Sequence, residues 1–231
     1  MNRIMGEKIE IVSRKNKTTR SRILGIHTTA NAQVLFVDTP CLHESSKLLN
    51  TALNDAVDEA ARKCDVGVIL VDLTEGWREL HQVLFEKLTQ FDKAILIVGT
   101  KCDLPQAVEP FQLPPVPREP VAILRASGLT GEGTAEVEAA IIGQLPESPR
   151  LFDEDILTDR PARWLAGEFV RESIFEYLGQ ELPYSMAVDV IKYKEDAADL
   201  VTIHANILVM RDSQDRKSGV SGKRVDPGGR R

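Results

Sequence analysis

The sequence feature that most restricts the fold is the apolar run Val34–Val37, which ends abruptly at Asp38-Thr39-Pro40. Four apolar residues in succession, without polar alternation, predict a β-strand that is buried on both faces of a sheet. A strand cannot continue through the Asp-Thr-Pro triplet, which favours a turn. The pattern therefore predicts a carboxylate and a hydroxyl at the carboxyl end of a buried strand, where open α/β sheets bind ligands. Taken alone, the triplet is also typical of an ordinary strand-ending turn.

The rest of the first 146 residues alternates between predicted strands and helices. Ile23–Thr28 and Val34–Val37 flank a turn and predict an antiparallel hairpin. Further strands are expected at three apolar runs, of which the first two should be buried: Val66–Val71, Ala94–Gly99 and Val121–Arg125. Apolar residues at helical spacing predict helices at 47–64, 80–88 and 134–145. This alternation implies right-handed crossovers and predicts an α/β fold, with a mostly parallel sheet covered by helices on both faces.

A second, smaller domain is predicted after an acidic, proline-containing linker at 147–160. Its first element is a helix with an apolar face that ends near Gly179, and two strands, Met186–Tyr193 and Val201–Met210, follow it. The remaining residues show no periodicity, so we expect a basic, disordered tail at 215–231.

Charge, cysteine content and hydropathy limit the classes of protein to which the chain can belong. The net charge is −6, yet residues 211–231 hold seven Lys/Arg against three Asp. A basic end on an acidic body fits contact with a polyanion, although solvated surface charge is the commoner meaning. Cys41, Cys64 and Cys102 are an odd number without metal-site spacing, which favours reduced thiols in a cytosol. No apolar run is long enough to span a bilayer, and no signal peptide follows Met1.

Three predicted strand ends carry polar groups that suit a guanine nucleotide: Asp38-Thr39, Thr100–Asp103 and Ser127-Gly128. A carboxylate that accepts from the N1–H and the exocyclic amine of guanine rejects adenine, which would leave the carboxylate unpaired. A lysine stem can lie over the base and ribose, and the loop near Ser127 can close on the keto oxygen. Asp38 would lie in the outer shell of Mg²⁺, and a threonine of the preceding loop could ligate the ion.

Taken together, these segments resemble the Era-type GTPases, ribosome-assembly GTPases in which a GTPase domain is followed by a KH domain. Asp38-Thr39-Pro40 matches the family's D-T-P-G motif, and Thr100-Lys101-Cys102-Asp103 matches its N-K-x-D motif. Arg14–Arg20 resembles its switch I, residues 154–160 its interdomain linker, and Glu181–Ser185 the start of its KH strands. The resemblance extends from about Asn2 to Gln214.

The resemblance implies GTP/GDP and Mg²⁺ as cofactors. The implied fold is a P-loop-GTPase-like domain at 1–146, without its first strand and phosphate loop, and a partial type II KH domain at 161–214. The site residues that the resemblance implies are Asp38, Thr39, Pro40, Cys41, Leu42, Thr100, Lys101, Cys102, Asp103 and Ser127 for the nucleotide, Lys17, Thr18, Thr19 and Arg20 for switch I, and Thr18, Thr19 and Asp38 for the metal. No residue is assigned as catalytic.

The departures from the family bear on activity. No G-x-x-x-x-G-K-[ST] motif occurs in the sequence, and such a loop is what holds the phosphates. The strand before that loop would lie in the middle of the sheet, between 34–37 and 66–71. Cys41 replaces the glycine that approaches the γ-phosphate, Thr100 replaces asparagine, and Leu42 stands where many GTPases have a water-orienting glutamine. We therefore expect impaired GTP hydrolysis and a truncated or frameshifted reading frame. The alternatives are a non-hydrolysing ribosome-interaction module and an inactive gene fragment.

The family also implies partners: 16S ribosomal RNA, the small ribosomal subunit, and no DNA. The expected location is the cytoplasm, with peripheral contact at the inner membrane as an option. Gly219-Val220-Ser221-Gly222 has the spelling of the RNA-clamping G-x-x-G loop of KH domains. Gly219 and Gly222, with Arg216 and Lys217, are therefore the candidate RNA-binding residues, although a chance spelling in a disordered tail is the alternative.

Overall fold

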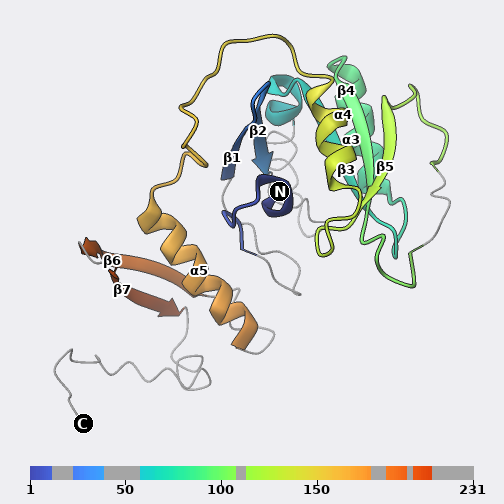
Figure 1. Cartoon of the computed structure of the whole chain (residues 1–231). Helices are drawn as coiled ribbons and strands as arrows, with labels where there is room; N and C mark the ends of the chain where they lie inside the picture. The colour runs from blue at the N-terminus through green and yellow to red at the C-terminus, as the bar shows by residue number, and fades with distance from the viewer. Residues whose placement is uncertain (12–22, 39–57, 108–112, 178–185, 197–199, 210–231) are drawn as a thin grey trace. The chain divides into compact units, whose positions relative to one another are not determined.

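A computed structural model describes residues 1–11, 23–38, 58–107, 113–177, 186–196 and 200–209 of the chain (Figure 1). The chain divides into two compact units. The first contains the ranges 1–10 and 19–159, and the second contains the ranges 11–18 and 160–231.

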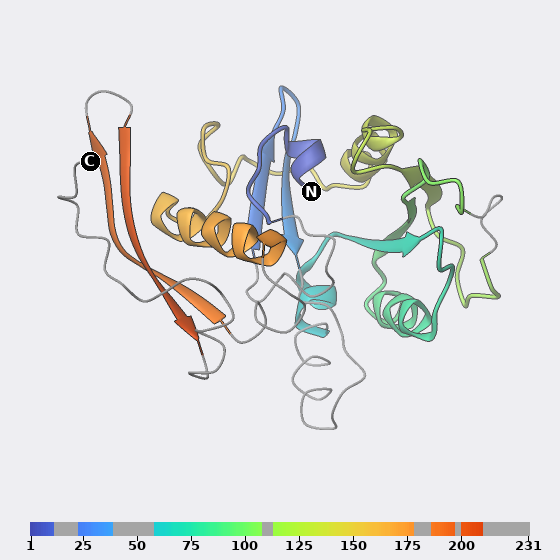
Figure 2. The same ribbon diagram turned by 90° about the horizontal axis from the view of Figure 1, so that it is seen from below.

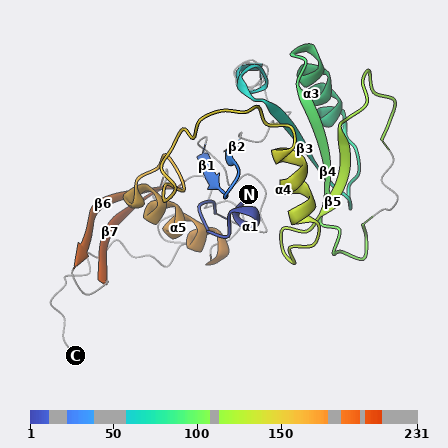
Figure 3. The ribbon, with the colours of Figure 1, turned by 45° about the horizontal axis from the view of Figure 1, so that its top comes forward.

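A parallel sheet organises the first unit. Its strand order is β3 (Val66–Asp72), β4 (Ala94–Thr100) and β5 (Ala122–Ala126), and both pairs of neighbours are parallel. The helices α3 (Glu79–Gln90) and α4 (Thr134–Ile142) follow β3 and β5 in the chain and lie on opposite sides of the sheet (Figure 3). The predicted alternation of strands and helices is thus confirmed in this part of the chain.

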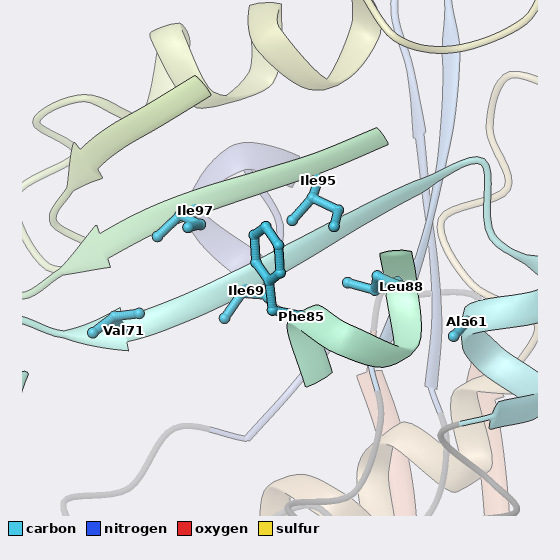
Figure 4. Close-up of a cluster of buried hydrophobic side chains, with 7 residues drawn as sticks. All are labelled: Ala61, Ile69, Val71, Phe85, Leu88, Ile95 and Ile97. Atoms are coloured by element: carbon cyan, nitrogen blue, oxygen red, sulfur yellow. The ribbon is translucent and has the colours of Figure 1, made fainter. Parts of the chain in front are cut away.

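The core lies on both faces of β4. On the α3 side, Phe85 is fully buried and packs with six other residues, which Figure 4 shows together: Ala61, Ile69, Val71, Leu88, Ile95 and Ile97. On the α4 side, Leu96 and Val98 pack with Val137 and Ile141. The continuous apolar sequence of β4 therefore predicted its two-sided burial correctly.

The prediction of burial on both faces is wrong for β3. Its side chains alternate between buried and exposed, and Val68 and Leu70 are 36% and 59% exposed. These two residues share the face of Leu96 and Val98, but α4 packs over β4 and β5 on that face. The same prediction fails for the run at 34–37, where Val34 is buried but Val37 is 39% exposed.

The predicted antiparallel hairpin is confirmed as β1 (Ile23–Thr28) and β2 (Gln33–Asp38), which form a separate two-stranded sheet. The outer edge of β1 is covered by the chain after α4, since the Ile26 amide donates to the Leu157 carbonyl at 2.8 Å. The Gln33 side chain also bonds that segment and accepts from the backbone amide of Phe152 at 3.0 Å. Within the described residues, no backbone pairing joins β2 to β3.

The first residues form a short helix. The helix α1 (Asn2–Met5) stops at Gly6, whose φ of 71° is the left-handed conformation that glycine adopts at helix ends. The guanidinium of Arg3 donates to the Thr130 carbonyl at 2.6 Å and so ties α1 to the loop after β5.

The described part of the second unit contains a helix and a long hairpin (Figure 2). The helix α5 (Ala162–Tyr177) packs on β6 (Met186–Asp196), which pairs antiparallel with β7 (Leu200–Val209). Ile174 and Met186 form the core between helix and hairpin, and the Arg163 guanidinium donates to the Val190 carbonyl at 2.6 Å. The predicted order of one helix and two strands is confirmed. None of the described helices is long and apolar enough to cross a membrane.

Candidate functional site

The carboxyl ends of the parallel strands bring together most of the predicted site residues that the structure describes. Asp72 is in register with Thr100, and Thr100 with Ala126, so the three strands end at the same level. The loops that carry Lys101–Asp103 and Ser127 therefore leave the sheet at one edge. This is the edge at which α/β sheets bind ligands.

The loop after β4 has a defined and unusual conformation. Lys101 has a φ of 59°, which few residues other than glycine adopt, and such values concentrate at functional sites. The Thr100 hydroxyl donates to the Val71 carbonyl at 3.2 Å, and the Leu104 amide donates to the Lys101 carbonyl at 3.1 Å. Asp103 lies in this turn and is half-buried. The loop can therefore present a lysine stem and a carboxylate together.

The loop after β5 is built around Ser127, which is fully buried. Its hydroxyl oxygen accepts from the amides of Leu129 and Thr130 at 3.2 and 3.0 Å, and its own amide donates to the Glu132 carbonyl at 2.8 Å. The hydroxyl is thus used to shape the loop. The space beside Gly128 is open, since a Cβ at this position would meet no atom within 4 Å. The loop therefore offers its backbone to a ligand.

Asp38, the predicted outer-shell magnesium residue, lies beside a second carboxyl group. The pKa of Glu10 is raised to about 8, first by burial, then by the hydrogen bond that its protonated carboxyl group donates to Asp38, and then by the negative charge of Asp38. Asn2 holds Glu10 in place, because its side-chain oxygen accepts from the Glu10 amide at 3.0 Å and its amide donates to the Glu10 carbonyl at 2.7 Å. Asp38 Oδ2 and Glu10 Oε1 are buried without a hydrogen-bond partner. Two buried carboxyl oxygens are thus available to water.

This pair predicts a stability that depends on pH. Because the pKa of Glu10 is raised in the folded state, its contribution is fully present below about pH 4.5 and is lost as the pH rises through about 8. Glu10→Gln keeps a neutral side chain, so we expect it to raise the free energy of unfolding by about 2 kcal/mol at about pH 9, or about 5 °C in Tm, and to change little near about pH 5. Thermal unfolding across this range measures the effect.

The matched control is Glu7→Gln, which changes an exposed carboxylate of the same segment and should leave the pH profile as it is. If Glu10→Gln and the unaltered chain gave parallel profiles, Glu10 would be ionised in the folded state and the raised pKa of Glu10 would be disproved.

The other predicted site residues lie outside the described residues: Lys17, Thr18, Thr19, Arg20, Thr39, Pro40, Cys41, Leu42, Arg216, Lys217, Gly219 and Gly222. The part of the chain that the structure describes holds no cluster of three or more His, Cys, Asp or Glu that could bind a metal ion. A hollow of about 510 Å³ is lined by residues between Arg150 and Ile156, and no predicted site residue lines it.

Sequence reasoning missed two carboxylates of this region, Glu10 and Asp72. Asp72 ends the apolar run Val66–Val71 in the same way as Asp38 ends its own run, so the pattern could have found it. Asp72 pairs with Lys101, with 2.5 Å between Oδ2 and Nζ. No local pattern marks Glu10, because its partner is 28 residues away in the chain.

Comparison with known proteins agrees with this geometry. The family profile described as "50S ribosome-binding GTPase" matches residues 1–101. The GTPase Era of Geotalea uraniireducens is 36% identical over 236 residues, which cover 97% of this chain and 76% of the relative. The GTPase Era of Thermosipho melanesiensis is 37% identical over 218 residues, which cover 93% of this chain and 73% of the relative.

Two solved structures are similar in fold. A variant of Aquifex aeolicus Era bound to GDP·AlF4⁻ superimposes with a TM-score of 0.79 at 31% identity, over 92% of this chain and 74% of that one. Era in complex with MgGDPNP and nucleotides 1506–1542 of 16S ribosomal RNA superimposes with a TM-score of 0.77 at 28% identity, over 95% of this chain and 80% of that one. Both likenesses span the sheet and the helix–hairpin unit, because each covers nine-tenths or more of the chain.

Proposed function

The chain belongs to the Era family of GTPases, and on that premise we propose that it binds guanine nucleotides at the carboxyl edge of β4 and β5 and acts on 16S ribosomal RNA in assembly of the small ribosomal subunit. Similar proteins were solved with GDP·AlF4⁻ and with MgGDPNP and 16S ribosomal RNA, which supports both parts of the proposal.

The observation that carries the proposal is the common edge of the Lys101–Asp103 loop and the Ser127 loop. In this proposal the Asp103 carboxylate accepts from the two donors of guanine, the Lys101 stem lies over the base, and backbone amides after Ser127 face the keto oxygen. Asp38, with Thr18 and Thr19, would hold Mg²⁺ or its water. Asp38 Oδ2, which is buried without a hydrogen-bond partner, is the oxygen available for this role. Thr39, Pro40, Cys41, Leu42, Thr100 and Cys102 complete the proposed site.

An exchange of base specificity tests the proposal. Asp103→Asn exchanges the acceptor for a donor, so we expect the preference for GDP over xanthosine diphosphate to reverse, by about tenfold or more. Saturation-transfer NMR on the full chain measures both nucleotides even where binding is weak.

Asp92→Asn is the control, since Asp92 is an exposed carboxylate in a turn of the same unit, with a φ of 52°. Its variant should keep the preference for GDP. An unchanged preference in Asp103→Asn would remove Asp103 from the site.

For RNA we propose contact through the basic segment 211–231, which includes Arg216, Lys217, Gly219 and Gly222. The described part of the second unit holds one helix and two strands, so the base-stacking surface of a KH domain is not assembled from them. We expect weak binding of single-stranded RNA that is indifferent to sequence and falls with salt, with a log–log slope of about −0.7 per phosphate contact.

Filter binding with a 16S segment and its scrambled form measures this at several salt concentrations. Deletion of 211–231 should abolish binding. If the shortened chain still preferred the 16S segment, the specific surface would lie upstream, in the helix–hairpin unit.

The remaining assignments also belong to the proposal. The domain limits are 1–146 for the GTPase domain, 147–160 for the linker and 161–214 for the partial KH domain. GTP hydrolysis, which we expect to be impaired, a place in the cytoplasm and peripheral contact with the inner membrane are proposed from the family alone. A second candidate function, a non-hydrolysing ribosome-interaction module, is favoured by the absence of G-x-x-x-x-G-K-[ST] from the sequence.

A further inference from the structure

The Asp72 carboxylate is held on both oxygens. Oδ1 accepts from the amide and the hydroxyl of Thr74 at 2.9 and 2.7 Å, and Oδ2 pairs with Lys101 Nζ at 2.5 Å. The Asp72 side chain is 19% exposed, whereas that of Lys101 is 56% exposed. Burial alone would raise the pKa of Asp72, but the hydrogen bonds from Lys101 and Thr74 outweigh it and lower the pKa. The carboxylate is therefore charged at neutral pH and oriented before any ligand arrives.

The frame around this pair is rigid. The Asp72 carbonyl accepts from the Gly76 amide at 2.8 Å, and the Leu73 amide donates to the Thr100 carbonyl at 3.1 Å, so the turn after β3 is bonded to the end of β4. Leu73 is buried and lies close to Gly99: a Cβ added at Gly99 would be 2.6 Å from Leu73 Cδ2. Carboxylate and ammonium thus stand on two neighbouring strand ends that cannot shift independently.

We propose that Asp72 is a positioning residue for the guanine site: it anchors the Lys101 ammonium so that the lysine stem is already laid out as a platform for the base. The inference rests on the proposed function. A free lysine side chain loses much rotamer freedom when a ligand immobilises it. Anchoring the ammonium before binding removes part of that cost, which is how preorganisation increases affinity.

The ion pair between Asp72 and Lys101 also changes the charge that the site presents to a ligand. The Asp72 carboxylate neutralises the ammonium, so Lys101 meets the base with its methylene groups and does not act as a free cation for phosphates. Guanosine, which carries no phosphate, is therefore the probe that isolates this effect from attraction between a released lysine and a phosphate.

A double-mutant cycle on the full chain tests the proposal. Guanosine affinity is measured by saturation-transfer NMR titration for the unaltered chain, Asp72→Asn, Lys101→Met and the double variant. We expect Asp72→Asn to weaken binding about fivefold in the unaltered background and to have no further effect beside Lys101→Met. A purely structural role would give the same loss in both backgrounds.

Two further variants serve as a control and as a second test. Asp58→Asn removes another ion pair of the first unit, that with Lys87, and should leave guanosine affinity unchanged. Thr74→Val removes one donor to the Asp72 carboxylate and gives a second cycle with Lys101→Met, which decides the case if Asp72→Asn does not fold.

Equal losses in both backgrounds, or no loss, would overturn the positioning role while leaving guanine binding in place. If the unaltered chain bound guanosine no better than adenosine, the proposed function itself would fail, and the inference with it.

Discussion

Calorimetry with GTP and Mg²⁺ on the 231-residue chain should show no dissociation constant below about 1 μM. Phosphate contacts supply much of the affinity for a nucleotide, and they come from the backbone amides and the lysine of a G-x-x-x-x-G-K-[ST] loop. The sequence contains no such motif, and by resemblance to the family Cys41 would replace the glycine that approaches the γ-phosphate. In the proposed site, Asp103 and Lys101 would recognise the base but would not hold the triphosphate.

The matched experiment joins the strand and phosphate loop of a relative, such as Aquifex aeolicus Era, to Met1. We expect GTP affinity to rise by about a hundredfold or more, which is about 2.7 kcal/mol. The same fusion with alanine in place of the loop lysine should lose most of the gain. Submicromolar binding by the chain alone would contradict the prediction and show that other residues hold the phosphates.

Self-association through β3 is the second large effect that we expect. β3 has seven residues, pairs only with β4 within the described residues, and carries no charged side chain before Asp72. On the sheet face, Val68 and Leu70 add exposed apolar surface beside this edge. Uncharged edges of this kind pair with other chains. The opposite edge, β5, has only five residues and includes Arg125, so it is better protected.

Analytical ultracentrifugation over a range of concentrations, beside thermal unfolding, measures this association. Leu70→Lys places a charge on an exposed position of the edge strand and should reduce association markedly without lowering Tm. Ile123→Lys is the control, because Ile123 is 47% exposed on the opposite edge strand. A monomer at all concentrations with one cooperative transition would disprove the prediction.

The order and kind of the elements could be predicted from the sequence because the signals are local. The helical spacing of Leu80, Val83 and Leu84 marked α3, and the unbroken apolar run of β4 indicated burial on both faces, as observed. The strand-end motif Thr100–Asp103 also followed from the chain itself, because a polar loop after a buried strand has to emerge at the sheet edge.

The tertiary structure decided which sheet faces are covered by helices and which residues distant in the sequence contact each other. The runs of β3 and β4 are similarly apolar, yet among the described residues only β4 has strands on both sides and helices over both faces. Lys101 lies 29 residues from Asp72, and Glu10 lies 28 from Asp38. The predicted linker at 147–160 pairs with the outer edge of β1, a contact that its sequence does not indicate. Local periodicity indicates which residues of a segment can be buried or paired. The residues that they contact lie in distant segments, so these contacts are determined only by the tertiary structure.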